Sequence, residues 1–510
     1  MPTQLADWTA AAASGVLLVL SFPKFGHPVF AWIALAPLLL ALVSRVSMLR
    51  AFGLGLTTGV IYFAGTLYWM SGVMGRYGGL NTAVAIAVNA AFVAYVALYP
   101  ALFAVVMRRL TIAFEARALL AAPFVWTATE LGRSYLFTGF PWVPLGNSQA
   151  TFLSVAQAAS VFGVFGLSAL VASASAAVAA VVLRRAFRPA AMVAAGIALV
   201  AVWGHARARA AALTHEGTPI RVALLQPNVL EEERENVANA PKILQRDLTM
   251  TREALANDGV SLVVWPESGL SPYTIEDYPQ VAALIRGLAV QAHVPILVGS
   301  DQYQWGVVDG RREVEKSYNA AFLIRRDGTT GAVYRKMHLV PWGEYVPLKD
   351  WLTFVGPLVQ AIGRGFDAGT TATLLPVGTH EISTAICYEI IYPDLVRRFV
   401  LEGSELLTTI TNDSWFGATS APYQHFEQAS LRAIEEGRYL VRAANTGVSG
   451  IVDPYGHVLA RSAIYQQAVV VGDARLLTGV TIYARTGDVF AYASAVVTLL
   501  LLVAARARRV

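Results

Sequence analysis

The chain has 510 residues, of which 55% are apolar and only 14% are charged. This balance is unusual for a soluble protein, so membrane-spanning helices are the first expectation. The net charge of +5 does not indicate a nucleic-acid partner, because much of the positive excess lies in short loops between apolar runs. The single cysteine, Cys387, excludes an intramolecular disulfide.

Long apolar runs fill the first 205 residues, and one more lies near the C-terminus. A helix needs about 20 largely apolar residues to cross a bilayer, where no water is available to bind the main chain. No Lys or Arg precedes the first run, so we expect a retained helix rather than a cleaved signal peptide. We predict eight spans, near residues 9–22, 27–44, 51–73, 80–107, 116–136, 161–183, 187–204 and 487–505.

Arginines are concentrated in every second connection between the predicted spans. Short loops rich in Lys and Arg usually stay in the cytoplasm, which predicts that both chain termini are cytoplasmic. The residues that decide this orientation are Arg45, Arg50, Arg108, Arg109, Arg117, Arg184, Arg185, Arg188, Arg506, Arg508 and Arg509.

Three domains follow from this topology. Residues 1–205 are predicted to form a seven-helix membrane bundle, and residues 206–486 a folded domain outside the cytoplasm. Residues 487–510 are predicted to form a last membrane helix with a basic cytoplasmic tail. The middle stretch is too long for a loop and long enough to bury a core of its own.

The middle domain alternates short β-rich runs with amphipathic runs, which is typical of an α/β fold. Candidate strands are 220–226, 261–265, 295–300, 319–325, 382–387, 405–411, 448–452 and 467–472. Candidate helices are 241–257, 278–292, 392–402 and 424–438. In such folds the chemistry gathers where strands end, because loops there place side chains on a rigid frame.

Three strand ends or adjacent loops carry a thiol, a carboxylate and an ammonium. Glu267 follows one β-rich run, Lys336 follows another, and Cys387 ends a third. A cysteine nucleophile needs a base, and Glu267 could take the thiol proton. Lys336, with a main-chain N–H after Cys387, could stabilise the oxyanion that forms in acyl transfer.

Four sequence motifs around these residues resemble the nitrilase superfamily and its Glu-Lys-Cys triad. They are WPES at 265–268, YRKMHLVPWGEYVPL at 334–348, ICYEIIYPD at 386–394 and TNDSWFG at 411–417. With SFPKFG at 21–26 and GFPWVPLG at 139–146, the whole chain resembles the apolipoprotein N-acyltransferase family. The resemblance implies a nitrilase-like αββα sandwich inserted between transmembrane helices 7 and 8.

The resemblance also implies an activity and a location. The expected reaction is a ping-pong transfer through a Cys387 thioester, from a phospholipid such as phosphatidylethanolamine to the amino group of a diacylglyceryl-cysteine in lipoproteins. The enzyme is expected in the bacterial inner membrane as a monomer, with its catalytic domain in the periplasm. Two alternatives stay open: a membrane-anchored amidase that uses water as acceptor, and a non-catalytic scaffold or transporter.

Supporting roles near the triad are less constrained by the sequence. Glu344 could support the site or form a surface ion pair with Lys336. Glu389, two residues after the nucleophile, shares a face with Cys387 if the strand continues, and could orient Lys336 or bind main-chain N–H groups. Tyr388, between these two residues, is a further candidate for substrate binding.

Other candidate sites lie further from the triad. Asn412 and Trp415 could line the pocket, or belong to a turn. Glu130 and Arg133 could bind a headgroup, or form an ion pair that holds helices together. The segment 351–362 could dip into the membrane or pack on the domain. We expect no metal or other cofactor, because the histidines lack partners at ligand spacing.

Overall fold

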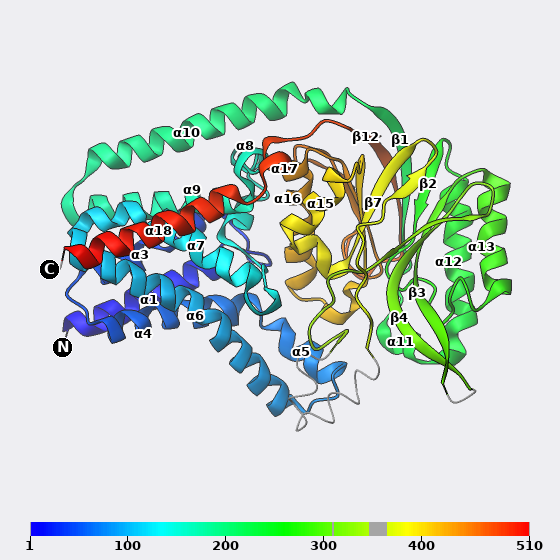
Figure 1. The fold of residues 1–510 in the computed structure, drawn as a ribbon, viewed down its shortest axis with the longest axis horizontal. Helices are drawn as coiled ribbons and strands as arrows, with labels where there is room; N and C mark the ends of the chain where they lie inside the picture. Colours follow the sequence, from blue (N-terminus) through cyan, green and yellow to red (C-terminus); the bar gives the residue numbers. More distant parts are fainter. Residues whose placement is uncertain (1, 309–310, 346–364, 509–510) are drawn as a thin grey trace.

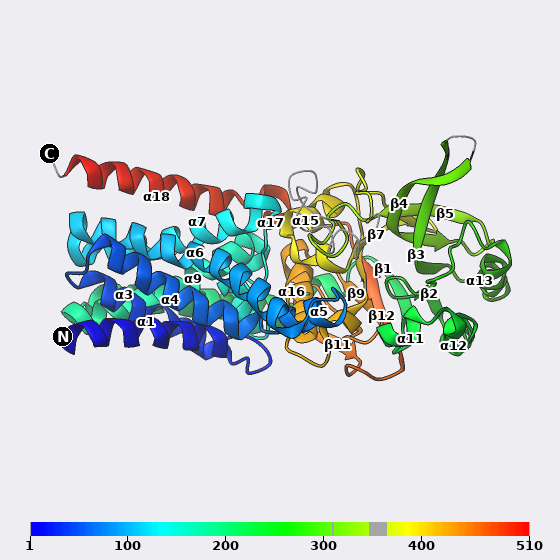
Figure 2. The same ribbon diagram turned by 90° about the horizontal axis from the view of Figure 1, so that it is seen from below.

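A computed structural model describes residues 2–308, 311–345 and 365–508. A helical part and an α/β part lie end to end, and both chain termini lie at the end of the helical part that is far from the sheets (Figure 1 and Figure 2). The segment 351–362 lies outside the described residues, so the two readings of it stay predictions.

Five helical segments of the described chain are long and apolar enough to cross a membrane: Met48–Thr66, Thr82–Thr138, Ala159–Leu183, Phe187–Thr214 and Val489–Ala507. Two shorter apolar stretches, Gln4–Leu20 and Pro28–Val43, precede them. The α-helices of this part are α1 (Pro2–Leu20), α2 (Ala31–Ala34), α3 (Ala36–Val43), α4 (Met48–Thr66), α5 (Trp69–Arg76), α6 (Thr82–Phe114), α7 (Ala122–Tyr135), α8 (Leu153–Ala156), α9 (Ala159–Arg184), α10 (Phe187–Ala210) and α18 (Val489–Ala507).

The predicted span 51–73 is two helices rather than one. Helix α4 ends at Thr66, because Leu67 has φ −115° and ψ 15°, outside the helical region. Helix α5 then runs beside the α/β part, beyond the main body of the bundle (Figure 1). The sequence hides this break because apolar residues continue through it.

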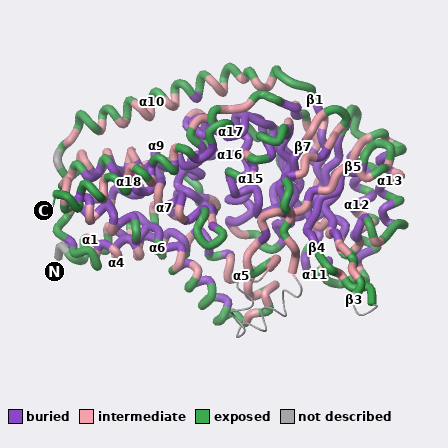
Figure 3. The backbone as a smooth tube through the Cα atoms, viewed as in Figure 1, coloured by how far each residue is buried: buried purple, intermediate pink, exposed green. Residues whose placement is uncertain are grey.

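Helix α10 lies at the edge of the bundle, in contact with α8 and α9 (Figure 1). Almost none of its apolar length is buried inside the protein, and it is mostly exposed in Figure 3. Because its surface is apolar, it fits a surrounding of lipid rather than of water. A short 3-10 turn, Ala212–Thr214, connects it to the first strand of the α/β part.

The α/β part contains two six-stranded sheets. The first has the order β12-β1-β2-β3-β4-β5, and the second β11-β10-β9-β8-β7-β6. In the first sheet, β1–β2 and β2–β3 are parallel pairs, and in the second, β7–β8 and β8–β9 are parallel. The strands are β1 (Thr218–Gln226), β2 (Val260–Val264), β3 (Ile296–Val308), β4 (Arg311–Ile324), β5 (Thr330–Arg335), β6 (Leu375–Val377), β7 (His380–Ile386), β8 (Leu406–Thr411), β9 (Leu440–Ala444), β10 (Gly450–Val452), β11 (Val458–Arg461) and β12 (Ala468–Leu476).

Alternating side chains of β1 divide between two hydrophobic cores. Ile220, Val222 and Leu224 pack in the core shared with the second sheet, whereas Ala223 and Leu225 pack with helices on the other face. This is the two-residue repeat of a strand that is covered on both sides.

Helices cover the outer face of each sheet. Those of the α/β part are α11 (Glu231–Glu235), α12 (Ala240–Leu255), α13 (Pro279–Ala292), α15 (Pro393–Leu401), α16 (Ala421–Glu436) and α17 (Ile482–Thr486). Helices α12 and α13 cover the first sheet, and α15 and α16 lie between the second sheet and the bundle (Figure 1 and Figure 2). The expected αββα sandwich is confirmed, and its strands lie in the chain between α10 and α17.

The strand does not continue past Cys387, so the condition placed on Glu389 is not met. The strand ends at Ile386, and residues Cys387–Ile391 form a 3-10 helix, so Glu389 does not continue a strand face with Cys387. The cause is the backbone of Cys387, whose φ of +53° no strand can accommodate.

Candidate active site

Glu267 lies in the turn that follows β2 and is 5% exposed. Its Oε1 accepts from Asn319 Nδ2 at 2.7 Å, and its Oε2 accepts from the main-chain N–H of Asn412 at 2.8 Å. Gly299 of β3 allows the turn to lie this close, because a Cβ there would be 2.3 Å from the carbonyl oxygen of Pro266. The carboxylate is therefore fixed from both sheets.

Lys336 follows β5 and is almost fully buried. Its Nζ lies 2.7 Å from Glu344 Oε1 and 3.5 Å from Glu267 Oε1. Burial by itself lowers the pKa of Lys336, but the carboxylates of Glu344 and Glu267 outweigh it and hold the pKa above its usual value. The ammonium is thus charged at neutral pH.

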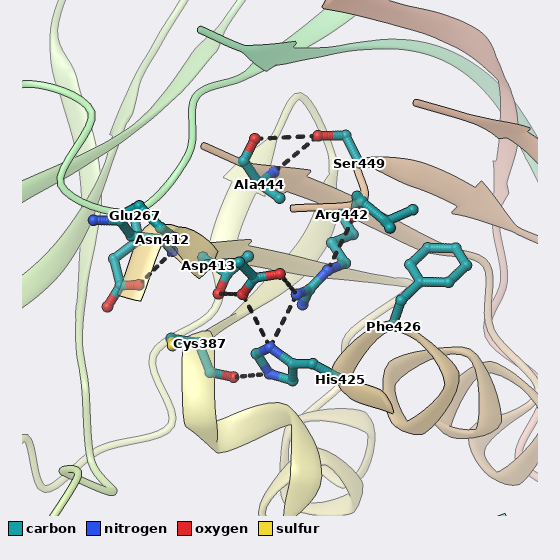
Figure 4. Close-up of polar contacts among 12 residues, drawn as sticks. Glu267, Cys387, Asn412, Asp413, His425, Phe426, Arg442, Ala444 and Ser449 are labelled. Carbon is teal, nitrogen blue, oxygen red and sulfur yellow. Dashed lines mark hydrogen bonds and ion pairs between the residues drawn. The ribbon is translucent and has the colours of Figure 1, made fainter. Parts of the chain in front are cut away.

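Cys387 begins the 3-10 helix after β7 and is 8% exposed. Its positive φ is rare for a residue with a side chain and costs on the order of 1 kcal/mol or more. Burial, with the charge of Glu267, raises the pKa of the Cys387 thiol, and Lys336 lowers it in part. The resting thiol is therefore protonated, and its sulfur lies on the side of the residue that faces Glu267 (Figure 4).

Glu389 accepts four hydrogen bonds that join the cysteine segment to the lysine segment. Its Oε2 accepts from Ile386 N–H at 2.7 Å, and its Oε1 accepts from Tyr334 Oη and from the N–H groups of Met337 and His338. Burial raises the pKa of Glu389 to about 7, although these donors lower it. Of the two roles considered for Glu389, the structure shows the binding of main-chain N–H groups.

Three more candidates lie around this centre. Asn412, 3% exposed, binds Glu267 through its main chain and Glu231 through its side chain. The buried ring of Tyr388 packs on those of His338 and Tyr392. Trp415 is 37% exposed and packs edge-on against Tyr77, just beyond the end of α5, with ring centroids 4.7 Å apart.

Glu130 and Arg133 are buried in α7. Arg133 Nη1 donates to the carbonyl oxygens of Phe140 and Trp142, and Glu130 Oε1 accepts from Leu145 N–H at 2.7 Å. Both side chains therefore hold the 139–146 loop in place. These contacts favour a structural role over the headgroup-binding hypothesis.

Sequence reasoning missed several residues that the fold brings to the centre. Asn319 of β4 donates both to Glu267 and to Glu344, and no local motif marks it. Asp301 of β3 pairs with Asn319 across the strands, and burial with the charges of Glu267 and Glu344 raises its pKa to about 6. Within the described residues, no group of three or more His, Cys, Asp or Glu is placed to hold a metal ion.

Comparison with known proteins identifies the family. The family model described as apolipoprotein N-acyltransferase N-terminal domain matches residues 14–177, and the one described as carbon-nitrogen hydrolase matches residues 221–477. The apolipoprotein N-acyltransferase of Geobacter metallireducens is 39% identical over 96% of this chain and 93% of its own length. The chain belongs to the apolipoprotein N-acyltransferase family.

Another member of the apolipoprotein N-acyltransferase family, from Methylococcus capsulatus, is 36% identical over 94% of this chain and 92% of its own length. Among solved structures, Saccharomyces cerevisiae Nit3 of the nitrilase superfamily covers 51% of this chain and 90% of its own, at 18% identity and a TM-score of 0.39. An amidase from Nesterenkonia covers 55% of this chain and 97% of its own, at 19% identity and a TM-score of 0.40.

Proposed function

We propose that this chain transfers an acyl chain from a membrane phospholipid to the α-amino group of the N-terminal diacylglyceryl-cysteine of lipoproteins. Its relatives carry the name apolipoprotein N-acyltransferase and align over nearly the whole chain. The match includes the helical part at residues 14–177, which a water-using amidase would not need. This favours the transferase over the amidase alternative.

Cys387 is the proposed nucleophile and Glu267 the proposed base. The resting thiol holds its proton, because burial and the Glu267 charge raise its pKa. As sulfur attacks the ester carbonyl of the lipid, the proton moves to Glu267, so no free thiolate need accumulate. Removing the Glu267 charge at the same moment also removes the repulsion that opposed a negative sulfur.

Lys336 and the main-chain N–H of Tyr388 are the proposed stabilisers of the oxyanion. The carbon–sulfur bond forms while the carbonyl electron pair moves onto oxygen. When the oxyanion collapses, the ester carbon–oxygen bond breaks, and Glu267 returns its proton to the leaving lysophospholipid. A thioester remains on Cys387.

The second half of the reaction runs through the same groups. The lipoprotein amine attacks the thioester carbonyl and gives a proton to Glu267, and the carbon–sulfur bond then breaks. The departing sulfur takes that proton, which restores the resting enzyme and leaves an amide on the lipoprotein. Bringing both substrates to one centre converts each bimolecular step into a step within the bound complex.

Glu344 and Glu389 are proposed to support the centre rather than react. Glu344 holds the Lys336 ammonium at 2.7 Å and accepts from Val340 N–H at 2.8 Å, so it fixes both a charge and a loop. Glu389 holds the nucleophile segment against the lysine segment.

The arrangement in the membrane is part of the same proposal. Residues 1–205 form the bundle, residues 206–486 a periplasmic domain, and residues 487–510 the last helix, with both termini in the cytoplasm of a monomer. The arginine distribution supports this orientation. Phosphatidylethanolamine is the proposed donor. The second sheet, which Cys387 follows, lies on the side of the α/β part nearer the bundle, with α16 between them.

The observation that carries the proposal is the burial of one thiol, one carboxylate and one ammonium in a single centre of a membrane-embedded family member. The test is mass spectrometry of the full chain after exposure to phosphatidylethanolamine vesicles. We expect one acyl adduct on Cys387 that a lipopeptide amine discharges and that water does not. Discharge by water alone would favour the amidase, and Cys387→Ser, which should fold without turnover, is the control for the adduct.

A further inference from the structure

His425 of α16 is a fully buried histidine that the proposed reaction does not use. Its ring is packed beside those of Trp142 and Phe416, with centroid distances of 5.5 and 6.0 Å. Trp142 belongs to the 139–146 loop of the bundle, whereas Phe416 follows the strand β8 of the sandwich. The ring therefore has little freedom to rotate.

The Nε2 atom of His425 lies 3.1 Å from the carbonyl oxygen of Cys387 (Figure 4). A carbonyl oxygen can only accept, so Nε2 carries the proton and donates it. Burial, with the charge of Arg442, lowers the pKa of His425, so the ring is neutral and Nδ1 is an acceptor. The carbonyl of the proposed nucleophile thus has a fixed side-chain donor in His425.

Arg442 of β9 fixes this tautomer from the other side of the ring. Its Nη2 lies 3.0 Å from His425 Nδ1 and 2.9 Å from Asp413 Oδ2, and all three side chains are buried (Figure 4). Burial alone would raise the pKa of Asp413, but the charge of Arg442 outweighs it and holds the pKa at about 2. Asp413 therefore stays ionised and holds the guanidinium, although its Oδ1 also lies 3.1 Å from Nδ1.

Fixing one end of a peptide group fixes the other end as well. In a planar trans peptide the C=O and the next N–H point in opposite directions. The Cys387 carbonyl points to His425, and the sulfur lies on the opposite side (Figure 4). The N–H of Tyr388 therefore points away from His425, and it lies in the first turn of a 3-10 helix, where N–H groups have no partner within the helix.

We propose that His425, held by Arg442 and Asp413, is a positioning residue that aims the Tyr388 N–H at the oxyanion of the acyl-transfer reaction. The idea rests on the proposed function of Cys387. Glu389 holds the same segment through Ile386 N–H, so the strained backbone of Cys387 is fixed from both sides. Small errors in the direction of such a donor are costly, because it must already face the oxyanion when the charge develops.

The test compares two amide replacements of His425 in the full-length enzyme. His425→Gln places an amide N–H near the former Nε2 and can still reach the Cys387 carbonyl. His425→Asn reaches only the former Nδ1 position, so it keeps a partner for Arg442 and loses the donor to Cys387. The control is His380→Asn, the same substitution at the start of β7, the strand that ends just before Cys387.

Two rates are measured for each variant: acyl-adduct formation from phosphatidylethanolamine vesicles, and alkylation of Cys387 by a small neutral haloacetamide. Alkylation builds no oxyanion. We expect His425→Asn to slow acylation by about 10- to 100-fold and to leave alkylation unchanged. His425→Gln should recover most of the acylation rate, and His380→Asn should match the unmodified enzyme in both rates.

The outcomes separate this inference from the function on which it rests. Wild-type acylation in His425→Asn, an equal loss of both rates, or a Gln variant as slow as the Asn variant would each overturn the positioning role alone. A missing adduct in the unmodified enzyme, with alkylation intact, would overturn the thioester mechanism and this inference with it.

Discussion

Asn412 donates its main-chain N–H to Oε2 of Glu267, and this bond connects the end of β8 in one sheet with the end of β2 in the other. Asn319 holds the second carboxylate oxygen from within the first sheet. The carboxylate therefore cannot rotate without breaking a bond to one sheet, and the packing of the two sheets sets its direction. In the proposed role of proton acceptor, a carboxylate fixed in this way would lose little entropy when the reaction begins.

Glu267→Gln keeps the size of the side chain and its acceptor for Asn412 N–H, but it cannot take a proton. We expect thioester formation to slow by roughly 10²- to 10⁴-fold, the usual contribution of a general base. The measurement is the rate of adduct formation on Cys387 by mass spectrometry. Glu232→Gln, at an exposed position, is the matched control and should acylate normally. A Glu267→Gln enzyme that acylates at the control rate would disprove the assignment of the base.

Glu389→Gln should lower the free energy of unfolding more than the removal of any single hydrogen-bond donor to Glu389. Four donors face this carboxylate, and the NH₂ group of a glutamine would place a donor opposite at least one of them. We expect a loss of about 2–4 kcal/mol in the free energy of unfolding, because a buried acceptor oxygen is lost and N–H groups stay unpaired. Tyr334→Phe removes one donor and should cost about 1 kcal/mol. Equal melting temperatures for the two variants would contradict this ranking.

Asp247→Asn should stabilise the protein, and more so at higher pH. Asp247 of α12 is 2% exposed, and neither carboxyl oxygen has a hydrogen-bond partner within the described part of the chain. Burial raises its pKa to about 8, against an opposite effect of Arg234 and Arg246. The folded pKa exceeds the unfolded value of about 3.9, so this group's stabilisation is complete below pH 4 and is lost as the pH rises through 8.

The measurement for this variant is thermal unfolding in detergent at pH 5 and pH 8. The stability gained by Asp247→Asn should grow between these values by an amount on the order of a few kcal/mol. Asp473→Asn, which removes an exposed partner of Arg221, should show no such growth. A gain that is the same at both pH values would show that Asp247 is ionised in the folded protein.

Gln424→Leu tests the junction between the bundle and the sandwich. The Gln424 amide accepts from Trp142 Nε1 at 2.8 Å and donates to the carbonyl oxygens of Pro23 and Thr66. Its loss leaves a buried indole N–H unpaired, so we expect about 1–3 kcal/mol of destabilisation and slower acylation from vesicles. The control is Gln428→Leu, one turn along the helix.

Gln428 is buried, and its amide atoms have no hydrogen-bond partner among the described residues. Replacing it with leucine should leave the stability unchanged or raise it, because an unpaired polar group is removed. An equal loss of stability in both glutamine variants would show that the hydrogen bonds of Gln424 do not specifically stabilise the junction.

Much of the fold could be predicted from local patterns. β-rich runs stop just before Glu267 and Lys336, so the ends of these two strands could be predicted. The side chains of β1 alternate between two cores, as the two-residue repeat of a strand predicts. The turn at Cys387 could not be predicted, since the main chain on either side of it is held by side-chain contacts from Glu389 and His425, which lie outside the strand. The break at Leu67 was hidden by uniform hydrophobicity.

The sequence singled out Cys387, Glu267 and Lys336 as candidate reacting groups. It also named Glu344, Glu389 and Asn412 as candidate supports, but it did not mark Asn319 or Arg442. Cys387, Glu267 and Lys336 are marked by unusual chemistry in an apolar sequence. Asn319 and Arg442 are ordinary strand residues, and only the pairing of strands places them at the centre. Support of this kind depends on tertiary contacts, which local periodicity does not contain.

Helix α10 also gives the bilayer a mechanical connection to the sandwich. Its 24 residues span about 36 Å, more than the roughly 30 Å of a typical hydrocarbon layer. Although the helix contacts α8 and α9, most of its length is exposed, so membrane thickness would act on its angle. The helix is connected to β1, which lies beside β2, the strand that precedes Glu267. A change in lipid length would therefore change the mechanical force on this sheet, in addition to changing which acyl donors are available.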